Sequence, residues 1–353
     1  MTSAVFTGLL VGIAFGFVMQ RGRFCMNSAF RDMFLLKDYT LLKTVGLALL
    51  VGLIGFALMD MGGIITLNPK PLFWGANVLG SFVFGIGMVI AAGCASGITY
   101  RVGEGMMGSL TAVIGLAIGG TLTAMGFLNP ISAFLQSSTK ITTADGANPT
   151  LATVVGLPHW VVAFGIAIIV IALWYWSSRK SSDDEDDDDV YLDTQDYSLG
   201  ERIFKRGWGW KTTGILIGLI SIVAFPLSAA SGRNYPLGIT AGWVNIVKVI
   251  MPTVEASLNW LGLLIIGIIL GSAVASLIAG EFKIRRPSWA VMGQTFGGGL
   301  LMGFGAVTSA GCNIGHILSG VPQLALGSIL AGISIVLGAW LMAYLMFIRP
   351  QAD

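Results

Sequence analysis

The sequence predicts an all-α membrane protein in which about nine transmembrane helices form a four-plus-one-plus-four inverted repeat, with re-entrant or broken segments at the centre. The first observation is composition. Of the 353 residues, 55% are hydrophobic and 11% are charged, and the mean hydropathy is +0.81, whereas soluble domains carry about 25% charged residues. The second is a series of long apolar stretches, and the third is a glycine-rich segment that occurs twice.

Nine apolar stretches are long enough to cross a bilayer, which takes about 20 residues in a helix. Their expected bounds are 4–19, 44–62, 72–92, 105–126, 152–176, 212–230, 258–280, 288–307 and 323–348. They divide the chain into a first inverted repeat (1–126), an outer loop (127–151), an extra transmembrane helix (152–176), an acidic cytoplasmic linker (177–211) and a second inverted repeat (212–348). Because the extra helix is single, the second repeat enters the membrane from the opposite side, as in many secondary transporters.

The distribution of lysine and arginine predicts the orientation, because these residues accumulate beside the cytoplasmic ends of membrane helices. Sixteen of the 20 fall on the side that holds the linker and the C-terminus; the other side has four, namely Lys70, Lys140, Arg233 and Lys248. We therefore expect a multi-pass protein embedded in the lipid of the bacterial cytoplasmic membrane, with its N-terminus outside and its C-terminus in the cytoplasm. The first helix has no positive residue before Arg21, so it is expected to be retained rather than cleaved as a signal peptide.

The linker carries ten of the 18 acidic residues between Asp183 and Glu201, seven of them consecutive. Such a run repels itself and is typical of solvated linkers, although it also suits docking to a basic partner. Without these ten, 8 acidic residues face 20 basic ones. The membrane body is therefore expected to attract anions.

The repeated segment, GIGMVIAAGCASG (85–97) and GFGAVTSAGCNIG (303–315), is identical at seven of 13 positions. Each glycine weakens a helix by about 1 kcal/mol relative to alanine, and irregular backbone is tolerated in a bilayer only where protein buries it or where it lines a water-filled path. The segments are therefore either breaks at the centre, where helix N-termini favour an anion, or tight helix contacts through small residues. Packing would accept alanine or serine equally well, so the paired Cys94 and Cys312 favour breaks.

A second pair of segments, QRGRFCM (20–26) and ASGRNYP (230–236), follows the first helix of each repeat, and here Cys25 corresponds to Tyr235. The arginines at this boundary can extend their charged groups to the membrane interface. Asn27 and Ser28 are short and uncharged, so this does not explain their position. Arg23 and Asn27 therefore join the candidate site. The polar residues around Cys25 are Arg21, Arg23, Asn27, Ser28, Arg31 and Asp32.

The three cysteines, Cys25, Cys94 and Cys312, contain no C-x-x-C pair, which argues against a disulfide framework. A single buried cysteine is usually an inert small hydrophobe. A thiol in apolar surroundings stays neutral and donates a weak hydrogen bond, whereas a thiolate would repel an anion. Three neutral thiols in glycine or arginine motifs therefore suit a soft, sulfur-bearing anion that must also leave readily.

Four motifs resemble the YeeE/YedE family of bacterial membrane proteins, whose characterised members take up thiosulfate: RGRFCMNSAFRD, AAGCASGITYRVGEG, NYPLGITAGW and SAGCNIG. The resemblance implies an hourglass-shaped helical body with loops reaching inward from both faces. It implies that Cys25, Cys94 and Cys312 contact thiosulfate in succession and places Arg101, Glu104, Asn234 and Tyr235 at matching positions. It also implies a small cytoplasmic sulfur-carrier protein as a partner.

His316 and Asn313 complete the candidate set, His316 as a pore-lining donor and Asn313 as the neighbour of Cys312. No nucleotide-binding loop, metal cluster or Ser/His/Asp set is apparent, so we expect no cofactor, no metal, no nucleic-acid partner and no enzyme activity. The expected function is inward transport of thiosulfate or a related anion. The alternatives are an intramembrane thiol enzyme that transfers sulfur, which would form a persulfide during turnover, and a structural membrane subunit.

Overall fold

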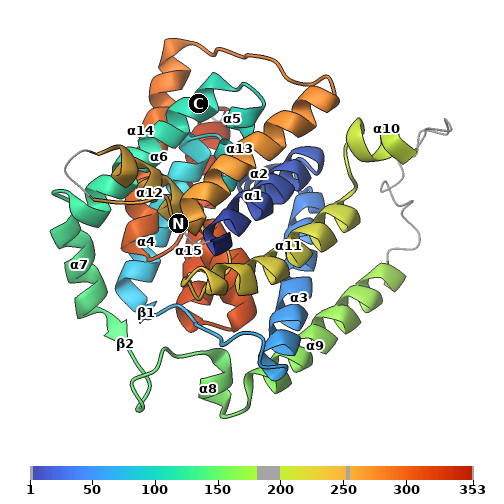
Figure 1. Cartoon of the computed structure of the whole chain (residues 1–353), viewed down its shortest axis with the longest axis vertical. Helices are drawn as coiled ribbons and strands as arrows, with labels where there is room; N and C mark the ends of the chain where they lie inside the picture. Colours follow the sequence, from blue (N-terminus) through green and yellow to red (C-terminus); the bar gives the residue numbers. More distant parts are fainter. Residues whose placement is uncertain (1–2, 181–198, 252–254, 352–353) are drawn as a thin grey trace.

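The computed structural model describes residues 3–180, 199–251 and 255–351, and their regular secondary structure is almost entirely helical (Figure 1). In this part of the chain, nine segments are long and apolar enough to cross a membrane. They are formed by α1 (Ser3–Arg21) with α2 (Met26–Leu35), α3 (Thr40–Met61), α4 (Trp74–Ile90) with α5 (Ala95–Gly103), α6 (Met107–Met125), α9 (His159–Lys180), α11 (Trp210–Ala230), α13 (Trp260–Ile278), α14 (Trp289–Thr308) and α15 (Leu326–Ala343) with the π-helix η4 (Tyr344–Ile348). The all-α membrane fold with about nine transmembrane helices is confirmed.

The shorter elements lie between these helices. They are α7 (Asn129–Ser138), α8 (Leu151–Val155), α10 (Leu199–Phe204), α12 (Thr240–Ile250), η2 (Ile314–Leu318), η3 (Val321–Gln323), η5 (Arg349–Gln351), and the two strands β1 (Leu72–Phe73) and β2 (Lys140–Ile141), which pair antiparallel. The expected outer loop 127–151 thus contains α7 and β2. The acidic run 183–189 lies outside the described residues.

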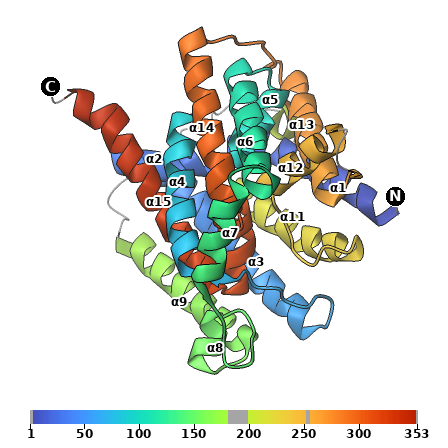
Figure 2. The same cartoon turned by 90° about the vertical axis from the view of Figure 1, so that its left-hand side faces the viewer.

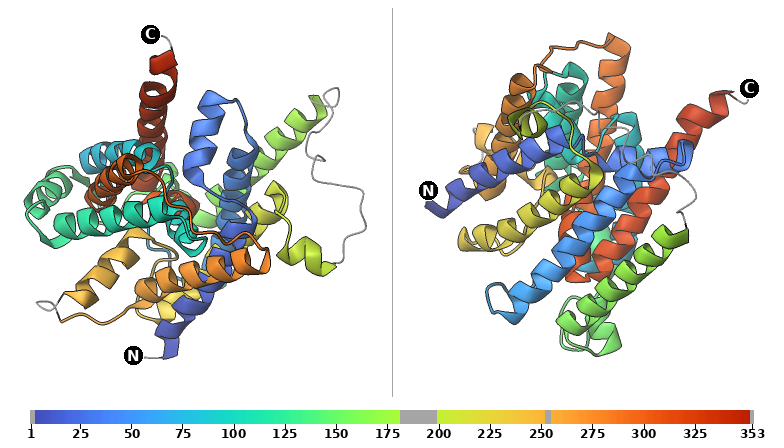
Figure 3. Two further views of the ribbon diagram at one scale, coloured as in Figure 1. Left: turned by 90° about the horizontal axis from the view of Figure 1, so that it is seen from above. Right: turned by 90° about the vertical axis from the view of Figure 1, so that its right-hand side faces the viewer.

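The extra helix begins later than expected, at His159 rather than at residue 152. Gly156 has a left-handed φ of 74° and closes α8, and Pro158 lacks the N–H that a continuous helix would need there. The helix α9 lies on the outside of the bundle against α3 (Figure 3). It therefore takes no part in the central packing.

The remaining helices pack in exchanged pairs. The first membrane-spanning segment of each repeat packs on the second of the other, α1 on α13 and α11 on α3. Likewise α4 packs on α15 and α14 on α6, and the equivalent helices α4 and α14 lie side by side (Figure 2). Gly80 lies against Gly305 whereas Gly87 lies against Gly298, so α4 and α14 run antiparallel. This relation is the one required of two copies with opposite orientation, and it supports the inverted repeat as a proposal.

Both repeated glycine segments end a helix in the same way. Ala92 and Ala310 have left-handed φ values of 55° and 64°, and the next residues, Gly93 and Gly311, donate to the carbonyl oxygens five residues earlier at 3.0 and 2.7 Å. The sequence located the breaks, but the left-handed residue in each is the alanine. The glycine beside it has another reason: a Cβ on Gly93 would lie 3.3 Å from the Arg101 guanidinium.

Gly267→Ala is expected to lower the free energy of unfolding by about 1–3 kcal/mol, the usual cost of overpacking. A Cβ at this position would overlap the Leu9 carbonyl oxygen and lie 2.9 Å from Gly12 Cα, so α1 and α13 would have to separate. Thermal unfolding in detergent measures the effect. Gly293→Ala in α14 is the matched control, because its Cβ meets nothing within 4 Å; equal melting temperatures for the two variants would contradict this account of the contact.

Candidate anion site

Two of the predicted cysteines meet at the centre of the bundle. Cys25 precedes the first residue of α2, and Cys94 occupies the same position before α5. Both are fully buried, and their Sγ atoms are 3.8 Å apart. Cys94 Sγ also accepts a hydrogen bond from the Gly97 amide at 3.3 Å. The two short helices therefore point their N-terminal ends at one pair of thiols, a setting that favours negative charge.

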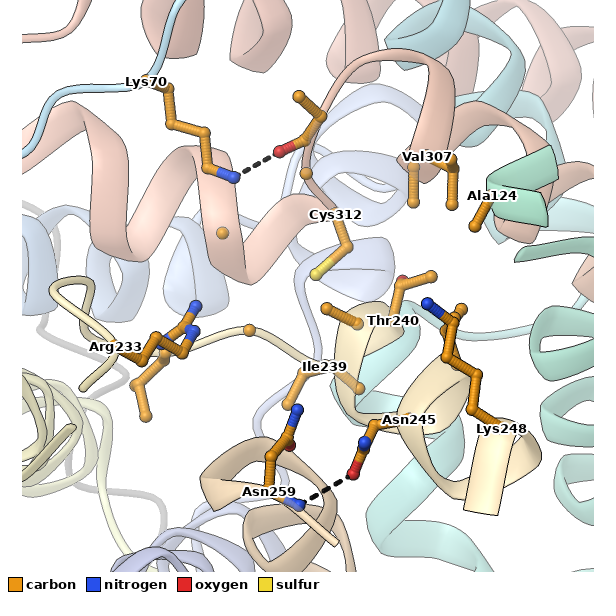
Figure 4. A pocket seen from close by; sticks show the side chains of 18 residues that line it. Lys70, Ala124, Arg233, Ile239, Thr240, Asn245, Lys248, Asn259, Val307 and Cys312 are labelled. Atoms are coloured by element: carbon orange, nitrogen blue, oxygen red, sulfur yellow. Dashed lines mark hydrogen bonds between the residues drawn. The ribbon is translucent and has the colours of Figure 1, made fainter. Parts of the chain in front are cut away.

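Cys312 lies in a separate cavity of about 360 Å³ and points into it (Figure 4). We call this the Cys312 cavity; the second break, α12 and the neighbouring loops form most of its wall. Its charged and polar side chains are Lys70, Arg233, Thr240, Asn245, Lys248, Asn259 and the thiol itself. None of the 18 described residues that line it is acidic. Three cations thus surround one thiol without a lining carboxylate.

Two cations of the Cys312 cavity, Lys70 and Arg233, are held in place by backbone, hydroxyl and ring contacts. Lys70 Nζ donates to the carbonyl oxygen of Ala310 and lies 4.8 Å from the centre of the Tyr235 ring. Arg233 donates to Ser228 Oγ at 3.2 Å and to the Pro236 carbonyl oxygen at 2.9 Å. These contacts fix the two charges, and neither forms an ion pair with a carboxylate of the described residues.

The electrostatics of the cavity follow from this arrangement. Burial and the nearby Arg233 charge lower the pKa of Lys70 from its usual value to about 8. Burial also lowers the pKa of Arg233, to about 10. Both shifts disfavour the charged forms, and a bound anion would reverse them.

The Cys312 cavity is connected to the thiol pair through the neighbours of the cysteines. Asn313, next to Cys312, donates from Nδ2 to the sulfur of Met26, next to Cys25, at 3.1 Å. The Oδ1 atoms of Asn27 and Asn313 are buried and have no hydrogen-bond partner among the described residues, which marks places where a water or ligand is expected. The residues next to Cys312 and Cys25 are thus in direct contact.

Other predicted residues have structural partners. Glu104 Oε1 accepts hydrogen bonds from Gln20 and Arg23, each at 3.0 Å, while its buried Oε2 has no partner in the described part of the chain. Asn234 donates to the Thr66 carbonyl oxygen at 2.9 Å. These contacts tie loops together, and neither Glu104 nor Asn234 lines the Cys312 cavity.

Three more predicted residues lie close to the breaks. Tyr235 donates to the Gly315 carbonyl oxygen at 2.7 Å. The fully buried His316 contacts the Ser309 carbonyl oxygen at 2.9 Å and Ser328 Oγ at 3.2 Å. Arg101 donates to the Ala92 carbonyl oxygen at 2.9 Å. Each therefore stabilises the backbone at or beside one of the two helix breaks.

Sequence reasoning missed most of the polar lining of the Cys312 cavity. The missed residues come from three segments, with Lys70 before β1, Asn245 and Lys248 on α12, and Asn259 before α13, and no motif connects the three. One signal was available. The side of the protein that is expected to face outward has only four lysines and arginines, and three of them, all except Lys140, line this cavity. A minority of cations that face one side of a membrane is thus a sign of a shared site.

Comparisons with known proteins agree with an anion site. A family model described as sulphur transport matches residues 21–341. The chain is similar to the thiosulfate transporter TsuA of Spirochaeta thermophila, with 43% identity over 98% of the chain and 100% of the relative. It is also similar to the thiosulfate transporter TsuA of Escherichia coli, with 31% identity over 99% of the chain and 97% of the relative. A probable transporter of Escherichia coli, YedE, is 35% identical over 33% of the chain and 28% of the relative.

Proposed function

Because the chain belongs to the sulphur transport family, we propose that it transports thiosulfate inward across the bacterial cytoplasmic membrane. The resemblance to the YeeE/YedE family is thereby confirmed. The relatives that match nearly the whole chain are named transporters, which favours a transporter over an enzyme.

The observation that carries the proposal is the Cys312 cavity, a cationic hollow without a lining carboxylate that ends at a buried thiol. Fixed cations in a low-dielectric pocket attract a dianion strongly. The soft sulfur of Cys312 complements the terminal sulfur of thiosulfate, while the cations complement its oxygens. Lys70, Arg233 and Lys248 belong to the side of the protein that has few lysines and arginines, which is the side expected to face outward. We therefore propose that this cavity opens outward and receives the substrate.

From the cavity, the anion passes to the thiol pair. The contact between Asn313 and Met26 joins the neighbours of Cys312 and Cys25, and Cys94 follows at 3.8 Å from Cys25. In the proposed order, the anion contacts Cys312 first and then Cys25 and Cys94, which together form one binding position deeper in the protein. Neutral S–H groups hold the anion weakly at each step, which conduction requires.

The orientation, the inverted repeat and the cytoplasmic recipient belong to the same proposal. The N-terminus lies outside, the C-terminus and the linker lie in the cytoplasm, and the two repeats place one break toward each side. A small sulfur-carrier protein receives the sulfur on the cytoplasmic side. The antiparallel packing of α4 on α14 supports the opposed breaks.

Reconstituted vesicles test the function. Purified protein in lipid vesicles is expected to take up labelled thiosulfate, with unlabelled thiosulfate competing more strongly than sulfate or chloride. Vesicles without protein are the control, and an absence of uptake above that background would overturn the proposal. Intact mass after exposure to thiosulfate tests the thiol-enzyme alternative: a conduit returns unmodified thiols, whereas an added sulfur atom would favour the enzyme.

Gly97→Ala is expected to slow uptake strongly without preventing folding. A Cβ at this position would lie 2.8 Å from Cys25 Sγ and 3.2 Å from Cys94 Sγ, so the thiol pair would have to move. Gly165→Ala in α9 is the control, because its Cβ would meet nothing within 4 Å. Initial uptake rates compare the two; equal rates would show that the geometry of the thiol pair does not matter.

A further inference from the structure

A second cavity, of about 330 Å³, lies beside the first break, and we call it the arginine cavity. Its lining includes Ala92, Arg101, Arg285, Arg286 and Thr295, and none of its described lining residues is acidic. None of the three arginines forms an ion pair within the described part of the chain. Three arginines therefore line one hollow, and no carboxylate of the described residues pairs with them.

The arginine cavity matches the Cys312 cavity at the level of the repeat. Ala92 and Ala310 occupy equivalent positions, and each lines its own cavity. The carbonyl oxygen of Ala92 accepts a hydrogen bond from Arg101, and that of Ala310 accepts one from Lys70. Each broken turn thus anchors one cation at the mouth of a cationic cavity.

One arginine of this cavity is held through its backbone and another through an aromatic ring. The Arg285 amide donates to the Gly105 carbonyl oxygen at 3.0 Å, and the Met107 amide donates to the Arg285 carbonyl oxygen at 3.1 Å. The Arg286 guanidinium stacks 4.6 Å from the centre of the Trp289 ring. The backbone of Arg285 and the guanidinium of Arg286 are therefore held by contacts that do not neutralise the arginine charges.

The arginine cavity is also connected to the thiol pair. Arg101 lies on α5, the helix that Cys94 precedes, and its guanidinium reaches back to Ala92, two residues before Cys94. Arginine forms bidentate hydrogen bonds to oxyanions, and Thr295 adds a hydroxyl to the lining.

We infer that the arginine cavity is a second anion-binding site, specific for a doubly charged tetrahedral oxyanion, on the opposite mouth from the Cys312 cavity. The inference rests on the proposed function for its direction: the site holds thiosulfate after it leaves the thiol pair. Its consequence is that thiosulfate accumulated in the cytoplasm occupies the site and slows further uptake.

Equilibrium binding of labelled thiosulfate to the full chain in detergent tests the site. The wild type is expected to bind two equivalents, and the Arg285→Gln/Arg286→Gln double variant is expected to bind one. Lys283→Gln is the matched control, because it removes one charge from the same loop outside the cavity lining and should leave two equivalents. One equivalent in the wild type, or two in a folded double variant, would overturn the inference. Melting temperature and gel filtration establish that each variant is folded.

Vesicles separate this inference from the proposed function. Thiosulfate loaded inside is expected to slow initial uptake by the wild type but not by the double variant, and loaded sulfate shows whether the site accepts the wider class of oxyanion. If internal thiosulfate does not slow uptake, the arginine cavity is not the inhibitory site, and the proposed transport function still stands. Two bound equivalents without any uptake would leave the site in place and refute transport.

Discussion

Cys94→Ala and Cys312→Ala are each expected to lower thiosulfate uptake roughly 10- to 100-fold, because a hydrogen bond to a charged group contributes about 1.5–3 kcal/mol and each 1.4 kcal/mol is a factor of ten. Both thiols are buried, so water cannot easily replace the lost donor. Growth on thiosulfate as the sole sulfur source should fail, while the protein still accumulates in the membrane.

The choice of controls separates the lost thiol from the lost volume. Val307→Ala truncates another side chain of the Cys312 cavity without removing a donor, and its uptake should stay near that of the wild type. Cys312→Ser keeps a donor and should retain more uptake than Cys312→Ala. Uptake unchanged in both alanine variants would refute the relay, whereas equal losses in Cys312→Ala and Val307→Ala would assign the effect to cavity volume.

The helices and the breaks were predictable because their signals are local. Apolar length identifies a membrane-spanning helix, and the repeated segments place Cys94 and Cys312 just after a helix end. The details of the turns were less predictable: Ala92 and Ala310, rather than the glycines, adopt the left-handed conformation. Their neighbours Gly93 and Gly311 instead admit the side chains of Arg101 and His316, which only the folded structure brings close.

The chemistry of the candidate site was predictable only in part. The cysteines were visible because they are rare and lie in short motifs, and the contact between Asn313 and Met26 joins two of these motifs. The polar lining from Lys70, Asn245 and Asn259 was not visible, because it depends on loops from both repeats meeting at one place. Glu104 illustrates the converse, since a residue in a conspicuous motif forms an ion pair with Arg23 at 3.0 Å.

Lys70 is expected to make the affinity of the Cys312 cavity for thiosulfate depend on pH. Without an anion its pKa is about 8, so Lys70 is charged at pH 7 and mostly neutral at pH 9. A dianion binds the charged form better and raises this pKa, so binding requires proton uptake once the pH exceeds 8. The affinity for thiosulfate is therefore expected to be constant below pH 7 and to fall about tenfold between pH 7 and pH 9.

Equilibrium binding in detergent measures this dependence without the effect of pH on any driving force for uptake. Lys70→Arg keeps its charge across the range and should remove most of the slope, while Lys70→Gln should bind weakly at every pH. The other titratable groups that face the anion are Arg233, whose pKa is about 10, Lys248 and the Cys312 thiol. Cys312→Ser removes the thiol titration, so a slope that persists in Cys312→Ser and disappears in Lys70→Arg belongs to Lys70. If thiosulfate affinity depends on pH in Lys70→Arg as it does in the wild type, another group titrates and Lys70 does not bind the anion in the Cys312 cavity.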